Sequence, residues 1–244
     1  MSNNYKVLSK FYERIIYDNN YKKWMEFLAG VVKDNQKGKV GLDVACGSGI
    51  FTRHLKRLGY DVTGVDISLE MLTEAKNNSA REKLNIKYLC QDMRSLKSIE
   101  KVDFITVIND GLNYVQNKDL LKTFKNFYAC LKKGGSLIFD LSTEYKIKNV
   151  LSNNAFGNDG DLLSYIWLNS YIKESNAVEI SLSIFEKDGD KYIRYNENQI
   201  EYAHSESLVK ELLTKAGFNV KSVTDGFGKK LNNTSERVLF VCEK

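Results

Sequence analysis

The sequence predicts a doubly wound, Rossmann-like α/β fold that includes all 244 residues in one domain. Three observations support this prediction. An apolar segment at 39–45 leads through a glycine-rich turn into a helix-forming segment, and a second apolar segment at 61–66 ends on an acid. Strand and helix patterns then continue to alternate as far as Thr143. Such alternation is typical of a parallel sheet covered by helices on both faces.

The N-terminal part of the chain predicts two amphipathic helices. Apolar residues recur at helical spacing across 11–32, and the pattern is interrupted around Asp18-Asn19-Asn20. We expect these helices to form a lid over the rest of the domain.

The first strand, at 39–45, runs directly into Gly47 and Gly49. A short apolar strand is expected at the centre of a parallel sheet, where both of its faces are buried. The two glycines leave room for a ligand beside the backbone and permit the positive φ of a sharp turn. The next helix, at 50–58, brings its amide-rich start to the same point. We therefore expect a ligand-binding cradle at this turn.

The second strand, at 61–66, begins after a Gly59-Tyr60 break and ends on Asp66. In doubly wound folds an acid about twenty residues past the glycines accepts hydrogen bonds from ribose hydroxyls. Asp66 stands at that distance, so the cradle is expected to bind an adenosine-containing cofactor.

Two residues favour S-adenosylmethionine over a dinucleotide. The dinucleotide fingerprint has a third glycine beneath the pyrophosphate, and Thr52 occupies that position here. Asp43 lies just before the loop, where it would repel a diphosphate but could accept hydrogen bonds from an ammonium group. S-adenosylmethionine carries an ammonium and a sulfonium and has no phosphate. A nicotinamide oxidoreductase is therefore disfavoured.

The alternation continues with three more elements before Thr143. Ser68 is the expected N-cap of a helix that runs through Lys76. Asn117 or Asp119 lies near the start of a helix that runs to Leu131. A strand is expected at 136–141.

Beyond Thr143 the alternation fails, and an antiparallel insertion is expected. Three segments are rich in β-branched and aromatic residues, at 163–172, 177–187 and 191–202. Asp188-Gly189-Asp190 is a hairpin turn signal between the last two. The insertion would lie over the carboxyl ends of the parallel strands, where open α/β sheets bind ligands. We expect it to contact the substrate, and a dimerisation sheet is the alternative.

The last part of the chain returns to the core. Ser205 can cap a helix that ends at Gly217, and strands are expected at 218–223 and 237–242. The expected parts are a helical lid, a cofactor-binding core, the insertion and the final core elements, at 1–37, 38–143, 144–204 and 205–244.

These motifs together resemble the class I S-adenosylmethionine-dependent methyltransferases of the small-molecule type. The matching segments are 42–49, 64–68 with its continuation at 70–72, 89–93, 102–105 and 131–139. The resemblance is good over 40–143 and loose elsewhere. It implies a seven-stranded sheet whose last strand is antiparallel, S-adenosylmethionine as the cofactor, and methyl transfer as the reaction.

The resemblance also implies roles for individual side chains. Asp66 would hold the ribose hydroxyls, with Ile67 and Met71 packed on the adenine. Asp92 would accept a hydrogen bond from the adenine amino group, while the Met93 amide donates to the ring. For Ile67 and Met71 an ordinary core position is the alternative, and for Asp92 it is a turn or helix cap.

Further cofactor contacts are implied at the methionine end. Asn109 would offer its backbone to the methionine portion. Tyr12 and Tyr21 stand in elements similar to the family's Y-D and Y-x-x-W, although Glu13 replaces the aspartate. They would close over the cofactor, or else pack between helices. The complete set of expected cofactor contacts is Tyr12, Tyr21, Asp43, Ala45, Gly47, Gly49, Asp66, Ile67, Met71, Asp92, Met93 and Asn109.

Three residues are candidates for catalysis, namely Asp110, Asn113 and His204. The first two lie with Tyr114 on a loop expected to face the methyl group, although a turn role is the alternative for Asn113. Amino-methyltransferases of nucleic acids often carry an N-P-P-Y-like tetrad there, and this chain contains no proline. His204 borders the insertion and is the candidate general base.

Composition limits the remaining possibilities. The net charge of +5 comes from scattered lysines, whereas nucleic-acid domains usually cluster their basic residues. Four cysteines, far apart in the sequence, are expected to be buried thiols, and no metal-ligand pattern is present. No apolar run approaches membrane-spanning length, and the N-terminus lacks a signal-peptide pattern. We expect a cytoplasmic monomer or homodimer.

The sequence therefore predicts methyl transfer to a small molecule by in-line displacement without a metal. Nitrogen is favoured over oxygen as the acceptor, because a neutral amine needs no base at the displacement step and the chain offers few bases. The alternatives are an RNA methyltransferase and a non-catalytic S-adenosylmethionine-binding interaction protein. The identity of the acceptor is not readable from the sequence.

Overall fold

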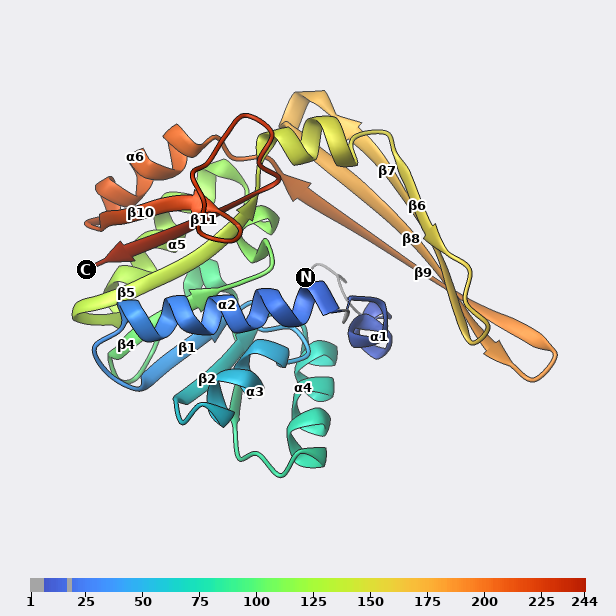
Figure 1. Ribbon diagram of the computed structural model, residues 1–244, viewed down its shortest axis with the longest axis horizontal. Coiled ribbons are helices and arrows are strands. Elements are labelled where there is room, and N and C mark those ends of the chain that lie inside the picture. Colours follow the sequence, from blue (N-terminus) through green and yellow to red (C-terminus); the bar gives the residue numbers. More distant parts are fainter. Residues whose placement is uncertain (1–6, 17–18) are drawn as a thin grey trace.

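The computed structural model describes residues 7–16 and 19–244. Of the predicted break around Asp18-Asn19-Asn20, Asp18 lies outside the described residues, and Asn19 and Asn20 begin the helix α2 (Asn19–Asn35). Two sheets organise the chain (Figure 1). The larger sheet has the strand order β10-β11-β5-β4-β1-β2-β3. Its strands are β1 (Val40–Val44), β2 (Asp61–Asp66), β3 (Lys87–Cys90), β4 (Val102–Val107), β5 (Leu131–Ser142), β10 (Asn219–Asp225) and β11 (Arg237–Glu243).

The strand β11 is antiparallel to both of its neighbours, β5 and β10. The neighbouring pairs among β1 to β5 are parallel. The predicted Rossmann-like sheet with an antiparallel last strand is therefore confirmed. β5 begins at Leu131, earlier than predicted, because Leu131 pairs with Val102 ahead of a register shift in the β4–β5 ladder.

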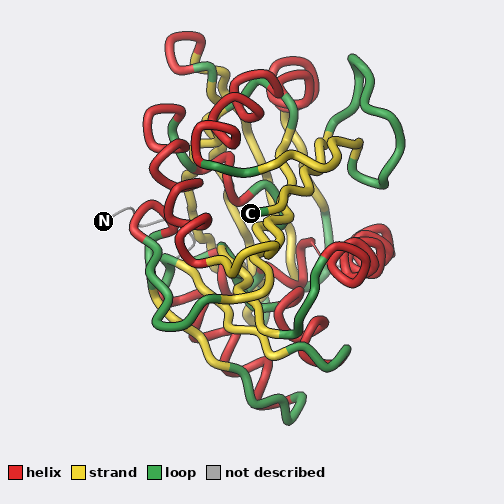
Figure 2. The backbone as a smooth tube through the Cα atoms, turned by 90° about the vertical axis from the view of Figure 1, so that its left-hand side faces the viewer, coloured by secondary structure: helices red, strands yellow, loops and turns green. Residues whose placement is uncertain are grey.

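Helices cover both faces of this sheet. They are α1 (Tyr12–Ile16), α2 (Asn19–Asn35), α3 (Ile50–Arg57), α4 (Leu69–Arg81), α5 (Asn117–Cys130) and α6 (Glu206–Ala216). Short helical turns are η1 (Leu8–Lys10), η2 (Met93–Ser95), η3 (Gly111–Tyr114), η4 (Lys146–Leu151) and η5 (Lys173–Ser175). Figure 2 shows helices on both sides of the strands, with α2 viewed nearly end-on.

Two apolar cores hold the helices to the sheet. Leu120, Phe124 and Phe127 of α5 pack with α6 on one face of the sheet. Leu28 of α2 and Leu55 of α3 pack on the other. Burial of this apolar surface is the main driving force for the three-layer arrangement. No helix in the described part of the chain has both the length and the apolarity needed to cross a membrane.

Local capping explains where several helices begin and end. The Ser68 hydroxyl accepts a hydrogen bond from the Met71 amide at the start of α4, and the Ser205 hydroxyl accepts one from the Leu208 amide at the start of α6. Gly217 ends α6 with a φ of +104°, a conformation that favours glycine. These three sequence predictions are confirmed.

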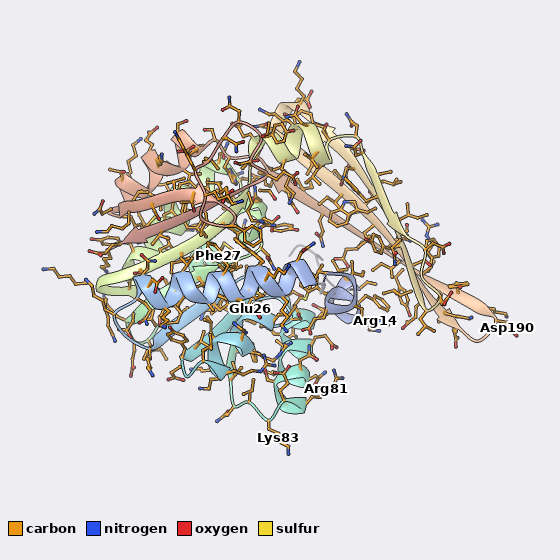
Figure 3. All side chains as sticks on the ribbon, viewed as in Figure 1. Arg14, Glu26, Phe27, Arg81, Lys83 and Asp190 are labelled. Carbon is orange, nitrogen blue, oxygen red and sulfur yellow. The ribbon has the colours of Figure 1, made fainter. Side chains whose placement is uncertain are left out.

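The second sheet is antiparallel, with the order β6-β7-β8-β9. Its strands are β6 (Ala155–Asn158), β7 (Leu163–Ile172), β8 (Ala177–Asp188) and β9 (Lys191–Tyr202). The three long strands confirm the predicted insertion, and β6 was not predicted. One face of the sheet packs on η1 and η4. Figure 3 shows Asp190 at the far tip of the β8–β9 hairpin and Arg14 on α1. Arg14 pairs with Glu186 of β8 at 3.6 Å.

The four cysteines are all free thiols. Cys130 and Cys242 are buried as expected, whereas Cys46 is half-buried and Cys90 is exposed. The expectation of buried thiols is therefore wrong for Cys90, because it ends β3 at the open edge of the sheet.

Candidate active site

A cavity of about 890 Å³ lies at the carboxyl ends of the parallel strands. Every expected cofactor contact lines it except Gly49. Gly49 instead precedes α3 with a φ of +79°, and a Cβ there would lie 2.6 Å from the Tyr88 hydroxyl oxygen. The positive φ and the close approach of Tyr88 therefore explain why this position is glycine, and contact with the cavity does not.

Asp66 organises the glycine turn. Its carboxylate accepts hydrogen bonds from the Gly47 amide at 2.8 Å and from the Ser68 amide at 2.9 Å. Burial raises the pKa of Asp66, and these backbone amides oppose that rise. Gly47 has a φ of +53°, and a Cβ added there would meet only Met71 and Tyr12, both at 3.9 Å. A side chain at Gly47 would therefore occupy the cradle itself, which fits a ligand that lies against this backbone.

Asp43 is buried beneath the cradle and held by two threonines. The Thr52 hydroxyl donates to it at 2.6 Å and the Thr106 hydroxyl at 2.9 Å. Burial raises the pKa of Asp43 to about 6, although both hydroxyls oppose the rise. Thr52, which stands where a dinucleotide-binding loop has glycine, thus fixes the orientation of this carboxylate.

The loop after β4 carries two consecutive residues with positive φ, Asn109 at +60° and Asp110 at +54°. Both backbone amides donate to the carboxylate of Asp140, at 2.8 and 3.2 Å. Non-glycine residues in this conformation are strained by about 1–3 kcal/mol each. Asp140 therefore stabilises two consecutive left-handed residues, at positions where asparagine and aspartate are the non-glycine residues that tolerate this conformation best.

The Asn109 side chain ties this loop to the N-terminal helices. Its amide nitrogen donates to the Tyr21 hydroxyl at 2.6 Å, and its carbonyl oxygen accepts from the Trp24 indole at 3.2 Å. Burial raises the pKa values of Tyr12 and Tyr21, so both phenols stay neutral. The lid and the β4 loop thus form one wall of the cavity.

Comparison with known proteins identifies the kind of site this is. Residues 42–135 match the family described as "Methyltransferase domain". The chain is 31% identical to a protein of Geobacillus sp. (strain WCH70) that is named a methyltransferase, over 98% of this chain and 99% of that one. A crystal structure of an S-adenosylmethionine-dependent methyltransferase from Clostridium acetobutylicum ATCC 824 is 33% identical, with a TM-score of 0.88 over 98% and 97% of the two chains.

The chain belongs to the class I S-adenosylmethionine-dependent methyltransferases. The methyltransferase also shares its fold with the sugar N-methyltransferase KedS8 from Streptoalloteichus sp ATCC 53650. That structure has a TM-score of 0.77 at 18% identity, over 98% of this chain and 92% of that one. The cofactor is S-adenosylmethionine, and the open cradle above Gly47, with the carboxylates of buried Asp43 and half-buried Asp66, suits an adenosine that carries a cationic tail.

Asp92 lines the cavity of the methyltransferase but is engaged by its own neighbour. Its carboxylate accepts from the Arg94 amide at 2.8 Å and pairs with the Arg94 guanidinium. Partial burial alone would raise the pKa of Asp92, but the hydrogen bonds from Arg94 outweigh it and the pKa is lowered. Asp92 thus caps the short helical turn η2. Because it also lines the cavity, we keep its hydrogen bond to the adenine amino group as a proposal.

The structure does not bring the three candidate catalytic residues to the cavity wall. Asp110 pairs with Arg237 at 3.1 Å and accepts from the Ser142 hydroxyl. Asn113 is fully buried and bonds the backbone of Ser142. Both side chains hold the loop together and neither lines the cavity, so the structure does not support a catalytic role for them.

His204 is likewise engaged away from the cavity. One ring nitrogen lies 2.6 Å from the Asn117 side-chain oxygen and the other 3.2 Å from the Leu112 carbonyl. Burial lowers the pKa of His204, and both nitrogens have partners in the α5 and η3 region. The structure therefore does not support it as the general base of the methyltransferase.

The far wall of the cavity is formed by Tyr114 of η3, whose loop was expected to face the methyl group, and by residues of the second sheet that were not predicted. The latter include Glu179, Asn198, Gln199 and Tyr202. A signal for part of this wall was present in the sequence. Glu197, Gln199 and Glu201 alternate along a predicted strand, and residues two apart in a strand share a face.

A pH dependence of cofactor binding is expected from Asp43. Because its pKa is raised to about 6, its carboxylate is present above that pH and is lost as the pH falls through it. Because the ionised carboxylate is expected to attract the cofactor's ammonium, affinity for S-adenosylmethionine should fall by up to about 10-fold between about pH 7 and about pH 5. Isothermal titration calorimetry across this range would measure it.

Asp43→Asn provides the matched comparison, since it keeps one oxygen for the threonine hydroxyls. The variant should bind weakly at every pH and lose most of the dependence. An equal pH dependence in the variant would assign the effect to another group, such as Asp66.

Proposed function

We propose that this methyltransferase transfers a methyl group to a nitrogen atom of a small molecule, without a metal ion. The observation that carries the proposal is the continuity of the cavity, which runs from the cofactor cradle to polar side chains of β8 and β9. Pockets for drug-sized ligands hold about 300–1,000 Å³, and this one holds about 890 Å³. It therefore has room for the cofactor and a compact acceptor.

The charge of the far wall favours a basic acceptor. Glu179 and Asp119 contribute carboxylates to the lining, with Lys118 beside them. Amines arrive from solution as ammonium ions, which such groups attract. The fold is also one that the sugar N-methyltransferase KedS8 uses, so its two-sheet arrangement is compatible with nitrogen as the acceptor.

The proposed reaction requires mainly that the acceptor nitrogen be aligned with the methyl group of the cofactor. S-adenosylmethionine, when bound, supplies a methyl group already activated by the sulfonium. The walls of the cavity must then hold the nucleophile near it and in line, an effect that can lower the barrier by about 7–11 kcal/mol. No metal is required for this step. We further propose that the protein acts in the cytoplasm, as a monomer or homodimer, with residues 144–204 on the substrate side.

Mass spectrometry with a methyl-labelled cofactor tests the proposal. The protein would be incubated with labelled S-adenosylmethionine, a metabolite extract and a chelator, and the products separated into basic, neutral and RNA fractions. We expect the labelled methyl on the nitrogen of a small basic compound. Label on an oxygen or on RNA, or label that appears only when a divalent metal is restored, would contradict the proposal.

A further inference from the structure

The inner face of β9 carries a row of buried polar side chains. Glu197, Gln199 and Glu201 are all buried, whereas Asn198 and Ile200 between them are exposed. Strands usually turn their apolar residues inward and their polar residues outward. From Glu197 to Glu201, the last part of β9, this pattern is reversed. Such a local violation of the usual pattern is expected at a functional position.

The three side chains of this row have different partners. Glu197 accepts hydrogen bonds from the backbone amides of Val7 and Leu8, each at 3.0 Å, and so fastens the N-terminal segment to the sheet. Gln199 and Glu201 instead share one partner. The Tyr114 hydroxyl lies 3.0 Å from the Gln199 side-chain oxygen and 3.1 Å from a Glu201 carboxylate oxygen.

Hydrogen-bonding capacity remains at this cluster. Within residues 7–16 and 19–244, neither the Gln199 amide nitrogen nor the second Glu201 carboxylate oxygen has a hydrogen-bond partner, although both atoms are buried. Buried polar atoms are nearly always paired in folded proteins. Two unpaired buried polar atoms in one cluster are therefore unusual, and they mark Gln199 and Glu201 as candidates for a functional role.

Tyr114 connects this cluster to the cavity. Tyr114 and Gln199 both line the cavity, at its far wall, while Glu201 lies behind them. The hydroxyl of Tyr114 thus stands between the acceptor space and a buried carboxylate. A hydroxyl in this position can receive a proton on one side and release its own on the other.

The surroundings of Glu201 allow its carboxylate to exchange a proton near neutral pH. Burial and the Asp110 carboxylate raise its pKa to about 7, while Lys146, the Tyr114 hydroxyl and Arg237 oppose the rise. The charged groups come from the β4 loop, η4 and β11, and Val178 is its apolar neighbour across the β8 pairing. A group with a pKa near the working pH serves best in proton transfer.

We propose that Glu201, acting through the Tyr114 hydroxyl, takes up the proton that an ammonium acceptor must lose before its nitrogen can be methylated. The inference rests on the proposed nitrogen acceptor. The acceptor's N–H bond breaks and its proton passes to the Tyr114 oxygen. The hydroxyl proton of Tyr114 passes at the same time to Glu201. The nitrogen keeps the electron pair, Tyr114 is restored, and Glu201 becomes a neutral carboxylic acid.

A binding experiment with sinefungin tests this proposal without a known acceptor. Sinefungin is an analogue of S-adenosylmethionine in which a carbon bearing an amine replaces the methylated sulfur, so it presents an ammonium group where the methyl would be. S-adenosylhomocysteine lacks that group and serves as the reference ligand. Calorimetry would give the ratio of the two affinities between about pH 6 and about pH 8.

In the wild type, the affinity for sinefungin relative to S-adenosylhomocysteine should be about tenfold higher at about pH 8 than at about pH 6, because an ionised Glu201 stabilises the ammonium through Tyr114. Glu201→Gln and Tyr114→Phe should each remove the pH dependence. Glu186→Gln is the control, since Glu186 accepts a hydrogen bond from Tyr195 in the same sheet but outside the cavity. It should retain the wild-type profile.

Affinity for S-adenosylhomocysteine within about twofold of wild type would show that each variant keeps its cradle. An unchanged pH dependence in Glu201→Gln would overturn the proposal. Loss in Glu201→Gln but not in Tyr114→Phe would overturn the relay through Tyr114. Because sinefungin supplies its own amine, the two experiments fail separately. A failed labelling experiment would overturn the nitrogen acceptor and with it the use of the relay on that acceptor, whereas a failed sinefungin experiment would overturn the relay alone.

Discussion

Replacing Asp66 with alanine is expected to weaken the binding of S-adenosylmethionine by a factor of roughly 10²–10⁴, the effect of losing the two charge-assisted hydrogen bonds that we propose it makes to the ribose. The same carboxylate holds the Gly47 amide, so the cradle loses its shape as well as its acceptor. Isothermal titration calorimetry at about pH 7.5 would measure the loss, at a pH where the carboxylate is ionised.

Asp61→Ala is the matched control for this experiment. Asp61 begins the same strand that Asp66 ends, is exposed, and pairs with Lys56 at the surface. It should leave cofactor affinity within about twofold of wild type, because a surface ion pair contributes little. Intact affinity in Asp66→Ala would refute the assigned cradle, and equal losses in both variants would indicate a general effect on β2.

Replacing Arg237 with methionine is expected to lower the free energy of unfolding by about 3–5 kcal/mol, as for other buried ion pairs that lose one partner. The guanidinium lies between the carboxylates of Asp110 and Asp140, and Asp140 is fully buried. Without it, two like charges face each other at the loop after β4. Urea denaturation followed by circular dichroism would measure the change.

Two further variants separate a charge effect from a packing effect. Lys215→Met removes an exposed pair with Glu211 and should change stability by less than about 0.5 kcal/mol. Adding Asp140→Asn to Arg237→Met should recover part of the loss, because one uncompensated charge is gone. No recovery would mean that the guanidinium acts mainly through its packing on Trp24, whose ring lies 5.5 Å away.

The cofactor side of the molecule was predictable because its signals are local. Gly47, Asp66 and Ser68 lie within a short stretch, and each reflects a turn, a strand end or a helix cap that its neighbours determine. The hairpin at Gly189 is local in the same sense, and it set the bounds of β8 and β9. β6 was missed because its four residues are all exposed and carry no alternation of burial.

The acceptor side was not predictable in the same way, because its contacts are distant in the sequence. The Asp110 carboxylate is paired with a residue 127 positions away, and the His204 ring with one 87 positions away. An acid and a histidine near strand ends suggested a catalytic role for Asp110 and His204. Only the fold shows that these side chains hold distant segments together, and that Gln199 joins Tyr114 at the cavity.

Because the cavity is divided between two sheets, such an enzyme can acquire a new acceptor specificity without altering its cofactor site. The seven-stranded sheet supplies the cofactor cradle, while β8 and β9 of the four-stranded sheet supply the opposite wall. Since the two sheets share no strand, substitutions in β8 and β9 can reshape the acceptor space and leave the cradle intact. Acceptor range can therefore diverge among descendants of this chain, or be redesigned in the laboratory, while use of the methyl donor is inherited unchanged.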